Sequence, residues 1–266
     1  MAKKVVISES TVTAGQLKDL FRMIDDGTIG FYEMKSILEN PNKFTKNEKT
    51  GLAVTIVRAI NILGASKVFT LQQANEVWGI NTVNMVPIVR YSEKTLREVA
   101  EANKKGEADW RLVYIVGSTL LKQRKIIGTN QNQQPCFYKN NDWYTKDKEK
   151  FWAEKKPETA GNYHLINFKG LFGGLNYQNQ EIEIQKFGNN FERTNPHVFG
   201  EAILAIFKIS GERIAENWYH RSSVLGAGRD RVSVGGFDAE GLRVNNVWVD
   251  FAYDNLRVSL FRKFEN

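Results

Sequence analysis

The chain is poor in the side chains that build disulfides and metal sites. Its 266 residues include one cysteine, Cys136, and three histidines, His164, His197 and His220. A single thiol excludes an internal disulfide framework and every zinc knuckle built on paired cysteines. Cys136 stands in the segment QPCFY with no histidine nearby, so a buried structural role is predicted for it rather than a catalytic one.

Long apolar runs are also lacking. Nothing approaches the ~20 consecutive apolar residues of a membrane-spanning helix. The opening MAKKVVISES has two lysines but no apolar core of a secretory signal. The sequence therefore predicts a cytoplasmic protein without a membrane span. A net charge of +7 permits contact with nucleic acid, but no block of like charge is long enough for a basic tail.

Motifs of common enzyme classes are missing as well. There is no HExxH and no Walker A sequence, and the glycine-rich stretches at 170–174 and 226–228 do not match a dinucleotide loop. Both stretches are predicted to be tight turns. His220 lies near Ser222, yet a Ser–His pair needs an orienting carboxylate and an oxyanion site. A hydrogen-bonded strand histidine is the favoured interpretation, a hydrolase is a remote alternative, and no catalytic residue is assigned.

Four carboxylates near the end of the sequence are hard oxygen ligands that could bind Ca²⁺. They are Asp238, Glu240, Asp250 and Asp254. Because they lack the spacing of an EF-hand loop, turn carboxylates are the favoured interpretation. No metal or other cofactor is predicted, and Ca²⁺ is kept only as an alternative.

The first hundred residues have mainly helical patterns, with capping residues before apolar stripes and glycine, proline or lysine after them. The predicted helices lie at 13–27, 31–41, 51–63, 70–79 and 92–106. The pair at 56–78 resembles a helix-turn-helix in a basic chain. Its second segment, LQQANEVWG, offers Gln72, Gln73, Asn75 and Glu76 but no Arg or Lys for phosphates, so plain helix packing is favoured.

The pattern changes after Gly106. Alternation at 110–116 and an extended run at 163–168 predict strands, and 118–126 and 181–187 predict helices. Asn195 and Pro196 form an N-cap and first turn before a broad apolar helix face. A further strand is predicted at 214–220. The expected fold class is α+β, with a helical N-terminal region at 1–107 and a second domain with short antiparallel strands at 108–266.

Residues 231–264 combine a regular apolar frame with irregular positions. The frame is predicted to be buried and consists of Leu242, Val244, Trp248, Leu256, Val258 and Leu260. The irregular positions share no chemistry, and they are Arg243, Asn245, Asn246, Phe251, Ala252, Tyr253, Asn255, Arg257, Ser259 and Phe261. A strict frame beside unconstrained positions indicates a scaffold that carries a replaceable binding surface.

Three stretches carry a family resemblance: GERIAENWY at 211–219, VGGFDAEGL at 234–242, and LRV at 256–258 followed by Arg262 and Lys263. Together they resemble the variable proteins of diversity-generating retroelements, in which error-prone copying at adenines rewrites the end of a target gene. The resemblance covers about residues 108–266. It implies a C-type lectin fold, related to that of formylglycine-generating enzymes. The scaffold positions expected on this basis are Trp218, Phe237, Leu242, Trp248, Leu256, Val258 and Arg262.

The genetic code is compatible with this resemblance. An AAC codon altered only at its adenines encodes Asn, Tyr, Phe, Arg, Ser or Ala, among others, but never Lys, Glu, Gln, Met or Trp. Between Arg243 and Phe261 only Trp248 belongs to that excluded set, and the frame already includes it. All ten irregular positions therefore fit diversification at adenines.

The expected function is ligand binding without catalysis. The ten irregular positions form the predicted ligand-binding surface, and a protein or another macromolecule is the expected partner, because Tyr, Arg and Asn suit adaptable recognition. Formylglycine-generating enzymes work through a cysteine pair, whereas this chain has one cysteine. The alternative function is a DNA-binding regulator that uses the N-terminal helices and the net positive charge.

Overall fold

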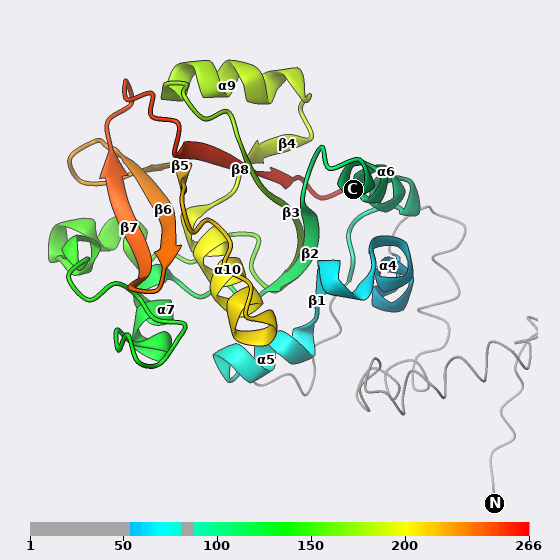
Figure 1. Cartoon of the computed structure of the whole chain (residues 1–266), viewed down its shortest axis with the longest axis horizontal. Coiled ribbons are helices and arrows are strands. Elements are labelled where there is room, and N and C mark those ends of the chain that lie inside the picture. The colour runs from blue at the N-terminus through cyan, green and yellow to red at the C-terminus, as the bar shows by residue number, and fades with distance from the viewer. Residues whose placement is uncertain (1–53, 81–87, 266) are drawn as a thin grey trace, which may run out of the picture. The chain divides into compact units, whose positions relative to one another are not determined.

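The computed structural model describes residues 54–80 and 88–265, which form a mixed α+β arrangement around a largely antiparallel sheet (Figure 1). The helices predicted at 13–27 and 31–41 lie outside these residues. Within the described part of the chain, no helix is long and apolar enough to cross a membrane.

The sheet has eight strands, and the last of them lies near its middle. The strands are β1 (Val68–Phe69), β2 (Trp110–Ile115), β3 (Asn162–Leu171), β4 (Phe191–Arg193), β5 (Tyr219–Leu225), β6 (Arg231–Asp238), β7 (Gly241–Val247) and β8 (Leu256–Arg262). Their order is β1-β2-β3-β8-β5-β6-β7, and β4 pairs with β8 as well. All pairs are antiparallel except β1 with β2 and β5 with β8. Strand β8 therefore joins the two halves of the sheet.

Helix α10 packs against β2, β5 and β6 and crosses the sheet in Figure 1. The helices are α4 (Ile56–Leu63), α5 (Leu71–Trp78), α6 (Glu93–Lys104), α7 (Leu120–Ile127), α8 (Lys150–Ala153), α9 (Tyr177–Lys186) and α10 (Pro196–Ser210). The first eleven residues of α10 are all buried, as expected for a helix that is covered on every side. The sequence-based start of α10 is confirmed, since Asn195 accepts a hydrogen bond from the His197 amide and Pro196 occupies the first turn.

Two other helix starts are confirmed, and one strand prediction is wrong. Thr70 and Gln73 form the predicted capping box of α5, and Ser92 caps α6. Strand β5 begins at Tyr219 rather than at residue 214. The reason is the backbone of Ala215, whose φ of 58° is incompatible with an extended strand.

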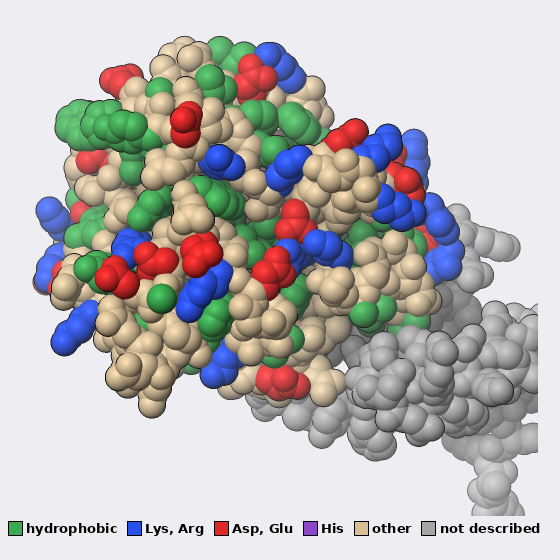
Figure 2. Space-filling model, viewed as in Figure 1, with side chains coloured by type: hydrophobic (Ala, Val, Ile, Leu, Met, Phe, Trp, Pro, Cys, Tyr) green, Lys and Arg blue, Asp and Glu red, His purple; other side chains and the backbone are tan. Residues whose placement is uncertain are grey.

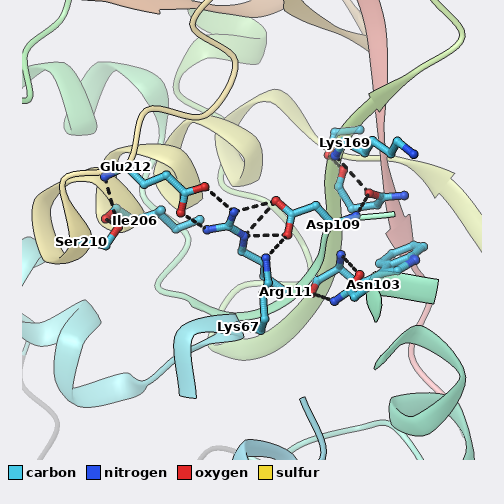
Figure 3. A network of polar contacts seen from close by, with 11 residues as sticks. Lys67, Asn103, Asp109, Arg111, Lys169, Ile206, Ser210 and Glu212 are labelled. Carbon is cyan, nitrogen blue, oxygen red and sulfur yellow. Dashed lines mark hydrogen bonds and ion pairs between the residues drawn. The ribbon is translucent and has the colours of Figure 1, made fainter. Parts of the chain in front are cut away.

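The described helices before residue 108, which are α4, α5 and α6, share one compact unit with the sheet, and this unit spans Thr50–Asn266. The predicted domain boundary at 107/108 falls inside this unit, between α6 and β2. A polar network around Arg111 ties its parts together (Figure 3). The buried guanidinium of Arg111 lies 2.6 Å from carboxylate oxygens of Asp109 and of Glu212, and Lys67 Nζ lies 2.6 Å from Asp109. The network connects the segment before β1 to β2 and to the end of α10.

Candidate ligand-binding face

Half of the irregular positions meet at one surface hollow. The end of β7 and the loop 248–255, together called the display face, surround a hollow of about 340 Å³. Its lining comprises Tyr219, Ser233, Asn245, Asn246, Val247, Phe251, Tyr253, Asn255 and Leu256. Five of the ten predicted binding residues are in this set. Strand and loop residues that lie up to ten positions apart in the sequence are thus brought to one site.

The display face exposes aromatic side chains. Phe251 is 41% exposed and Tyr253 57% exposed, and their ring centroids are 5.2 Å apart. Trp248 in the same loop is 61% exposed. Figure 2 shows hydrophobic side chains gathered at the end of the molecule where the loop between β7 and β8 lies. Apolar groups clustered in this way are typical of an interaction surface.

The backbone of the loop 248–255 is held by amide groups from elsewhere in the fold. Three of its carbonyl oxygens accept hydrogen bonds from backbone N–H groups outside the loop. The pairs are Tyr177 N to Val249 O at 2.9 Å, Gly174 N to Tyr253 O at 3.2 Å, and Tyr219 N to Asn255 O at 2.7 Å. Because these bonds use only main-chain atoms, they are independent of which side chain each loop position carries.

Two buried side chains add to this support. Arg221 Nη2 donates to Phe251 O at 2.6 Å, and Gln180 Nε2 donates to Leu256 O at 2.8 Å and to Phe172 O at 3.0 Å. Both Arg221 and Gln180 are fully buried. The scaffold therefore anchors the loop through the loop's own carbonyl groups and through that of Leu256 next to it, whereas the loop side chains, except that of the half-buried Val249, are exposed.

The glycine-rich stretch at 170–174 packs directly against this loop. A Cβ atom on Gly173 would lie 2.4 Å from Asp254 O, and Gly174 has a φ of +75°. A larger residue at 173 would thus collide with the loop backbone, and one at 174 would be strained. The tight turn predicted over 170–174 is confined to 173–174, because β3 continues to Leu171, and the contact with the display face was not predicted.

The remaining exposed or half-exposed irregular positions differ in their freedom. Ala252 is exposed. Arg257 is half-buried and donates through Nε to Asp254 O at 3.0 Å. Arg243 lies 4.5 Å above the Tyr138 ring. Arg257 and Arg243 therefore have structural contacts, whereas the Ala252 side chain is exposed.

Arg243 also bears on the Ca²⁺ alternative. Its guanidinium forms ion pairs with Asp238, at 2.6 Å, and with Glu240. Two of the four candidate ligands are therefore engaged by an arginine. In the described part of the chain no three His, Cys, Asp or Glu residues are grouped closely enough to hold a metal ion.

Three predictions about exposure are wrong. Ser259 and Phe261, expected at the surface, are 0% and 5% exposed. They lie on β8, which has neighbours on both edges and is covered on both faces, so alternation does not bring either residue to solvent. Trp248, expected in the buried frame, is exposed, because β7 ends at Val247 and its alternation does not extend into the loop.

The other predicted scaffold residues are in or beside the core. Phe237, Leu242, Leu256 and Val258 are buried, and so are the frame residues Val244 and Leu260. Trp218 and Arg262 are half-buried. Trp218 packs on Phe199 of α10 with ring centroids 5.6 Å apart, and Arg262 lies 5.1 Å from the centre of the Phe191 ring. The burial predicted for the frame is thus confirmed except at Trp248.

His220 and Ser222 are both bonded to the backbone of the core. His220 Nε2 lies 2.6 Å from Thr194 O, and its Nδ1 accepts from the Ser259 amide at 3.0 Å. Burial lowers the pKa of His220 to about 3. Ser222 Oγ donates to Val232 O at 2.8 Å. Both residues act here as structural members of β5.

The other two histidines and the cysteine are buried too. His164 Nε2 lies 2.8 Å from Thr159 O, and His197 Nε2 lies 2.9 Å from Trp152 O. Burial lowers the pKa of each of these histidines to about 4. Burial also raises the pKa of the Cys136 thiol, which is 0% exposed. The predicted burial of Cys136 is confirmed.

The helix-turn-helix interpretation of residues 56–78 does not match the structure. Helices α4 and α5 are separated by a 3₁₀ turn, Ala65–Lys67, and by β1, which pairs in parallel with β2. A helix-turn-helix has only a short turn between its helices. On the molecular face in Figure 2, basic side chains are interspersed with acidic ones.

The sequence did not predict the buried residues that donate hydrogen bonds to the loop 248–255 and to the adjoining Leu256. Arg221 and Gln180 lie 30 and 76 positions before their carbonyl partners Phe251 and Leu256. A charged residue between two polar neighbours in the strand HRSS gives no pattern that predicts burial. Only the folded arrangement brings these donors under the loop.

Comparison with known proteins gives no match: no protein-family model fits this sequence, and neither a curated protein nor a solved structure is similar to it.

Proposed function

We propose that this chain is a non-catalytic ligand-binding protein that presents a diversified surface to macromolecular ligands. In this proposal its C-terminal part has a C-type lectin fold, as in the variable proteins that it resembles. The α+β arrangement with a largely antiparallel sheet is compatible with that fold. Asn245, Asn246, Phe251, Tyr253 and Asn255 are the variable contact residues around the hollow.

The observation that carries the proposal is the anchoring of the loop 248–255. Its carbonyl groups are bound by scaffold amides and by Arg221. Side chains at Phe251, Tyr253 and Asn255 can therefore be exchanged without removing a bond that holds the loop. Surface substitutions away from such bonds change the free energy of unfolding by about 0.5 kcal/mol or less.

A randomised library tests this proposal. Positions 245, 246, 251, 253 and 255 are varied together and displayed on yeast, and binders to hen lysozyme are selected. We expect most members to fold and a few to bind, because the scaffold bonds persist. The matched library varies the buried positions 256, 258, 259, 260 and 261, and we expect most of its members to be unfolded. Equal loss of folded members in both libraries would contradict the proposal.

The gene itself offers a second test. A near-copy of the coding sequence for residues 231–264, differing at adenines and adjacent to a reverse transcriptase gene, is expected downstream.

A gel-shift measurement addresses the DNA-binding alternative. Tight, salt-sensitive binding to DNA that persists in a Phe251→Ala/Tyr253→Ala/Asn255→Ala variant would favour the regulator instead.

A further inference from the structure

A cavity larger than the hollow of the display face is bordered by α9, β4, β8 and the start of α10. It is called the β4 cavity here, because all of β4 (Phe191–Arg193) lines it. Its volume is about 460 Å³, and it shares no lining residue with the hollow. Leu256, the first residue of β8, lines the hollow, whereas Phe261 near the other end of β8 lines the cavity. A volume of several hundred Å³ is typical of a site for a small molecule.

The buried part of the β4 cavity lining is mainly apolar and aromatic. Ile184 of α9, Val198 of α10 and Phe261 of β8 line the cavity and are buried. The buried His164 lines it too, and the ring centroids of His164 and Phe261 are 5.0 Å apart. Burial lowers the pKa of His164 to about 4, so this ring is uncharged at neutral pH. Uncharged planar groups stack on such aromatic faces.

His164 also lacks one hydrogen-bond partner. Its Nε2 donates to Thr159 O at 2.8 Å, so Nδ1 of the uncharged ring is an acceptor. Nδ1 is buried and has no partner among the described residues. A buried acceptor without a donor calls for an explanation such as a bound molecule. Because His164 lines the β4 cavity, a molecule bound there would lie next to this imidazole.

The outer part of the lining has amide and hydroxyl groups. Gln185, Asn189 and Ser223 line the cavity and are exposed. A carboxamide presents a hydrogen-bond donor and an acceptor side by side. With this pair of groups, Asn and Gln side chains bind the edge of a nucleobase. The β4 cavity therefore combines aromatic faces for stacking with amides for an edge that has both donors and acceptors.

The charged side chains of the lining are paired with one another. Arg193 forms an ion pair with Glu181, and its two Nη atoms donate to three further oxygen atoms of the protein. Lys263 Nζ lies 3.8 Å from Glu192. Each cation that lines the cavity thus has a carboxylate partner, and a phosphate group would meet two carboxylates there. The lining favours a ligand without net charge.

We propose that the β4 cavity binds an uncharged planar heterocycle of the nucleobase type, as the free base or as a nucleoside without phosphate. The heterocycle lies against the Phe261 and His164 rings, and the amides of Gln185 and Asn189 bind its edge. This site is separate from the display face, so the proposal does not depend on the function proposed above.

Calorimetric titration of the full-length protein tests the proposal. The probes are adenosine, guanosine, cytidine and uridine, with ribose as the matched sugar. We expect at least one nucleoside to bind with a Kd below about 1 mM. Its 5′-monophosphate should bind more weakly, because Glu181 and Glu192 repel the phosphate, and ribose should not bind. Absence of binding by all four nucleosides, or equal binding of ribose, would overturn the proposal.

Variants of exposed residues locate the site. Gln185→Ala/Asn189→Ala should weaken binding of that nucleoside about tenfold, because two amides are lost. Gln178→Ala, on the same helix but outside the lining, should leave the Kd unchanged. Equal Kd values in these two variants would overturn the proposal.

A readout on the wild-type protein does not depend on any variant folding. In NMR spectra, the imidazole nitrogen resonances of His164 should shift as the nucleoside saturates the protein. The display-face variant Phe251→Ala/Tyr253→Ala/Asn255→Ala should bind the nucleoside like the wild type. Unshifted His164 resonances, or loss of binding in the display-face variant, would place the ligand elsewhere and overturn the proposal.

Discussion

The loop 248–255 and strand β8 adjoin each other in the sequence and contain the same irregular mixture of residues, yet the fold treats them in opposite ways. In the loop, the backbone is bound and the side chains are free, as at Phe251 and Tyr253. In β8, side chains such as Ser259 and Phe261 are enclosed on both faces of the sheet. A lack of pattern in the sequence therefore has two different causes.

The comparison teaches what makes a position replaceable. A loop position is replaceable when the scaffold binds its carbonyl group and leaves its side chain in solvent. A β8 position is irregular because a strand with two neighbours and two covered faces no longer needs to alternate between polar and apolar residues. Chemical variety alone does not distinguish these cases, whereas the hydrogen-bond partners of the backbone do.

The comparison is tested most strongly by making the same Phe→Ala substitution in β8 and in the loop 248–255. Phe261→Ala should lower the free energy of unfolding by about 3–5 kcal/mol, because it leaves a cavity in the core. Phe251→Ala should change it by about 0.5 kcal/mol or less, because the ring is partly exposed and its backbone bond to Arg221 persists. Urea unfolding of both variants checks this, and similar losses would show that the loop side chains are structural.

A second substitution weakens the anchoring of the loop without changing its side chains. Gln180→Leu removes the donor to Leu256 O and Phe172 O and the acceptor of Arg193 Nη1. We expect a loss of about 1–3 kcal/mol in stability. Amide exchange at Gly174 and Tyr177, which donate to loop carbonyls, should become faster.

The matched control for this substitution is Gln178→Leu, an exposed position on the same helix, α9. It should leave both stability and amide exchange nearly unchanged. Unchanged exchange at Gly174 and Tyr177 in the Gln180→Leu variant would show that backbone amides hold the loop without help from Gln180.

The third prediction concerns the pH dependence of stability that arises from His220, a buried residue of β5 that is hydrogen-bonded to Ser259 of β8. Burial holds the pKa of His220 at about 3, whereas an exposed histidine has a pKa of about 6.5. The unfolded chain therefore binds this proton first as the pH falls, so stability present above pH ~6.5 is lost toward pH ~3. Each pH unit in that window costs about 1.4 kcal/mol from one such group.

The variant His220→Gln separates this contribution from those of His164 and His197. Between pH 5.5 and 4.5, well below the pKa of the unfolded chain and above that of the folded one, it should lose about 1.4 kcal/mol less stability than the wild type, as measured by urea unfolding at each pH. Identical losses in the two proteins would mean that His220 is protonated in the folded state. Because His220 Nδ1 accepts from Ser259, the effect should first loosen β8.

Local signals in the sequence were enough to predict much of the fold. The caps at Thr70, Ser92 and Asn195 each satisfy a free amide within one turn, so neighbouring residues alone determine them. The strand expected at 214–220 failed because a single backbone angle at Ala215 interrupts it. The position of β8 between β3 and β5 depends on pairings with distant residues, which apolar periodicity does not specify.

The candidate site was predictable in part for the same reason. Phe251, Tyr253 and Asn255 follow the end of a strand pattern and lie at the surface, as expected. Trp248 was assigned to the core as a position of the regular apolar frame, but the strand ends one residue earlier. Arg221 could not be found, because its role is to bind a carbonyl group 30 positions away.

The place of β8 in the chain has a consequence for copying errors. This strand follows the loop 248–255 in the sequence and hydrogen-bonds to β3 on one side and to β4 and β5 on the other. A copying event that inserts or deletes a base within the loop would therefore shift the reading frame of β8. The two halves of the sheet would then have no strand between them. Under the proposed diversification, a frame-shifted copy would encode a chain that cannot fold. Only copies that keep the reading frame would give a folded protein whose display face can bind a ligand.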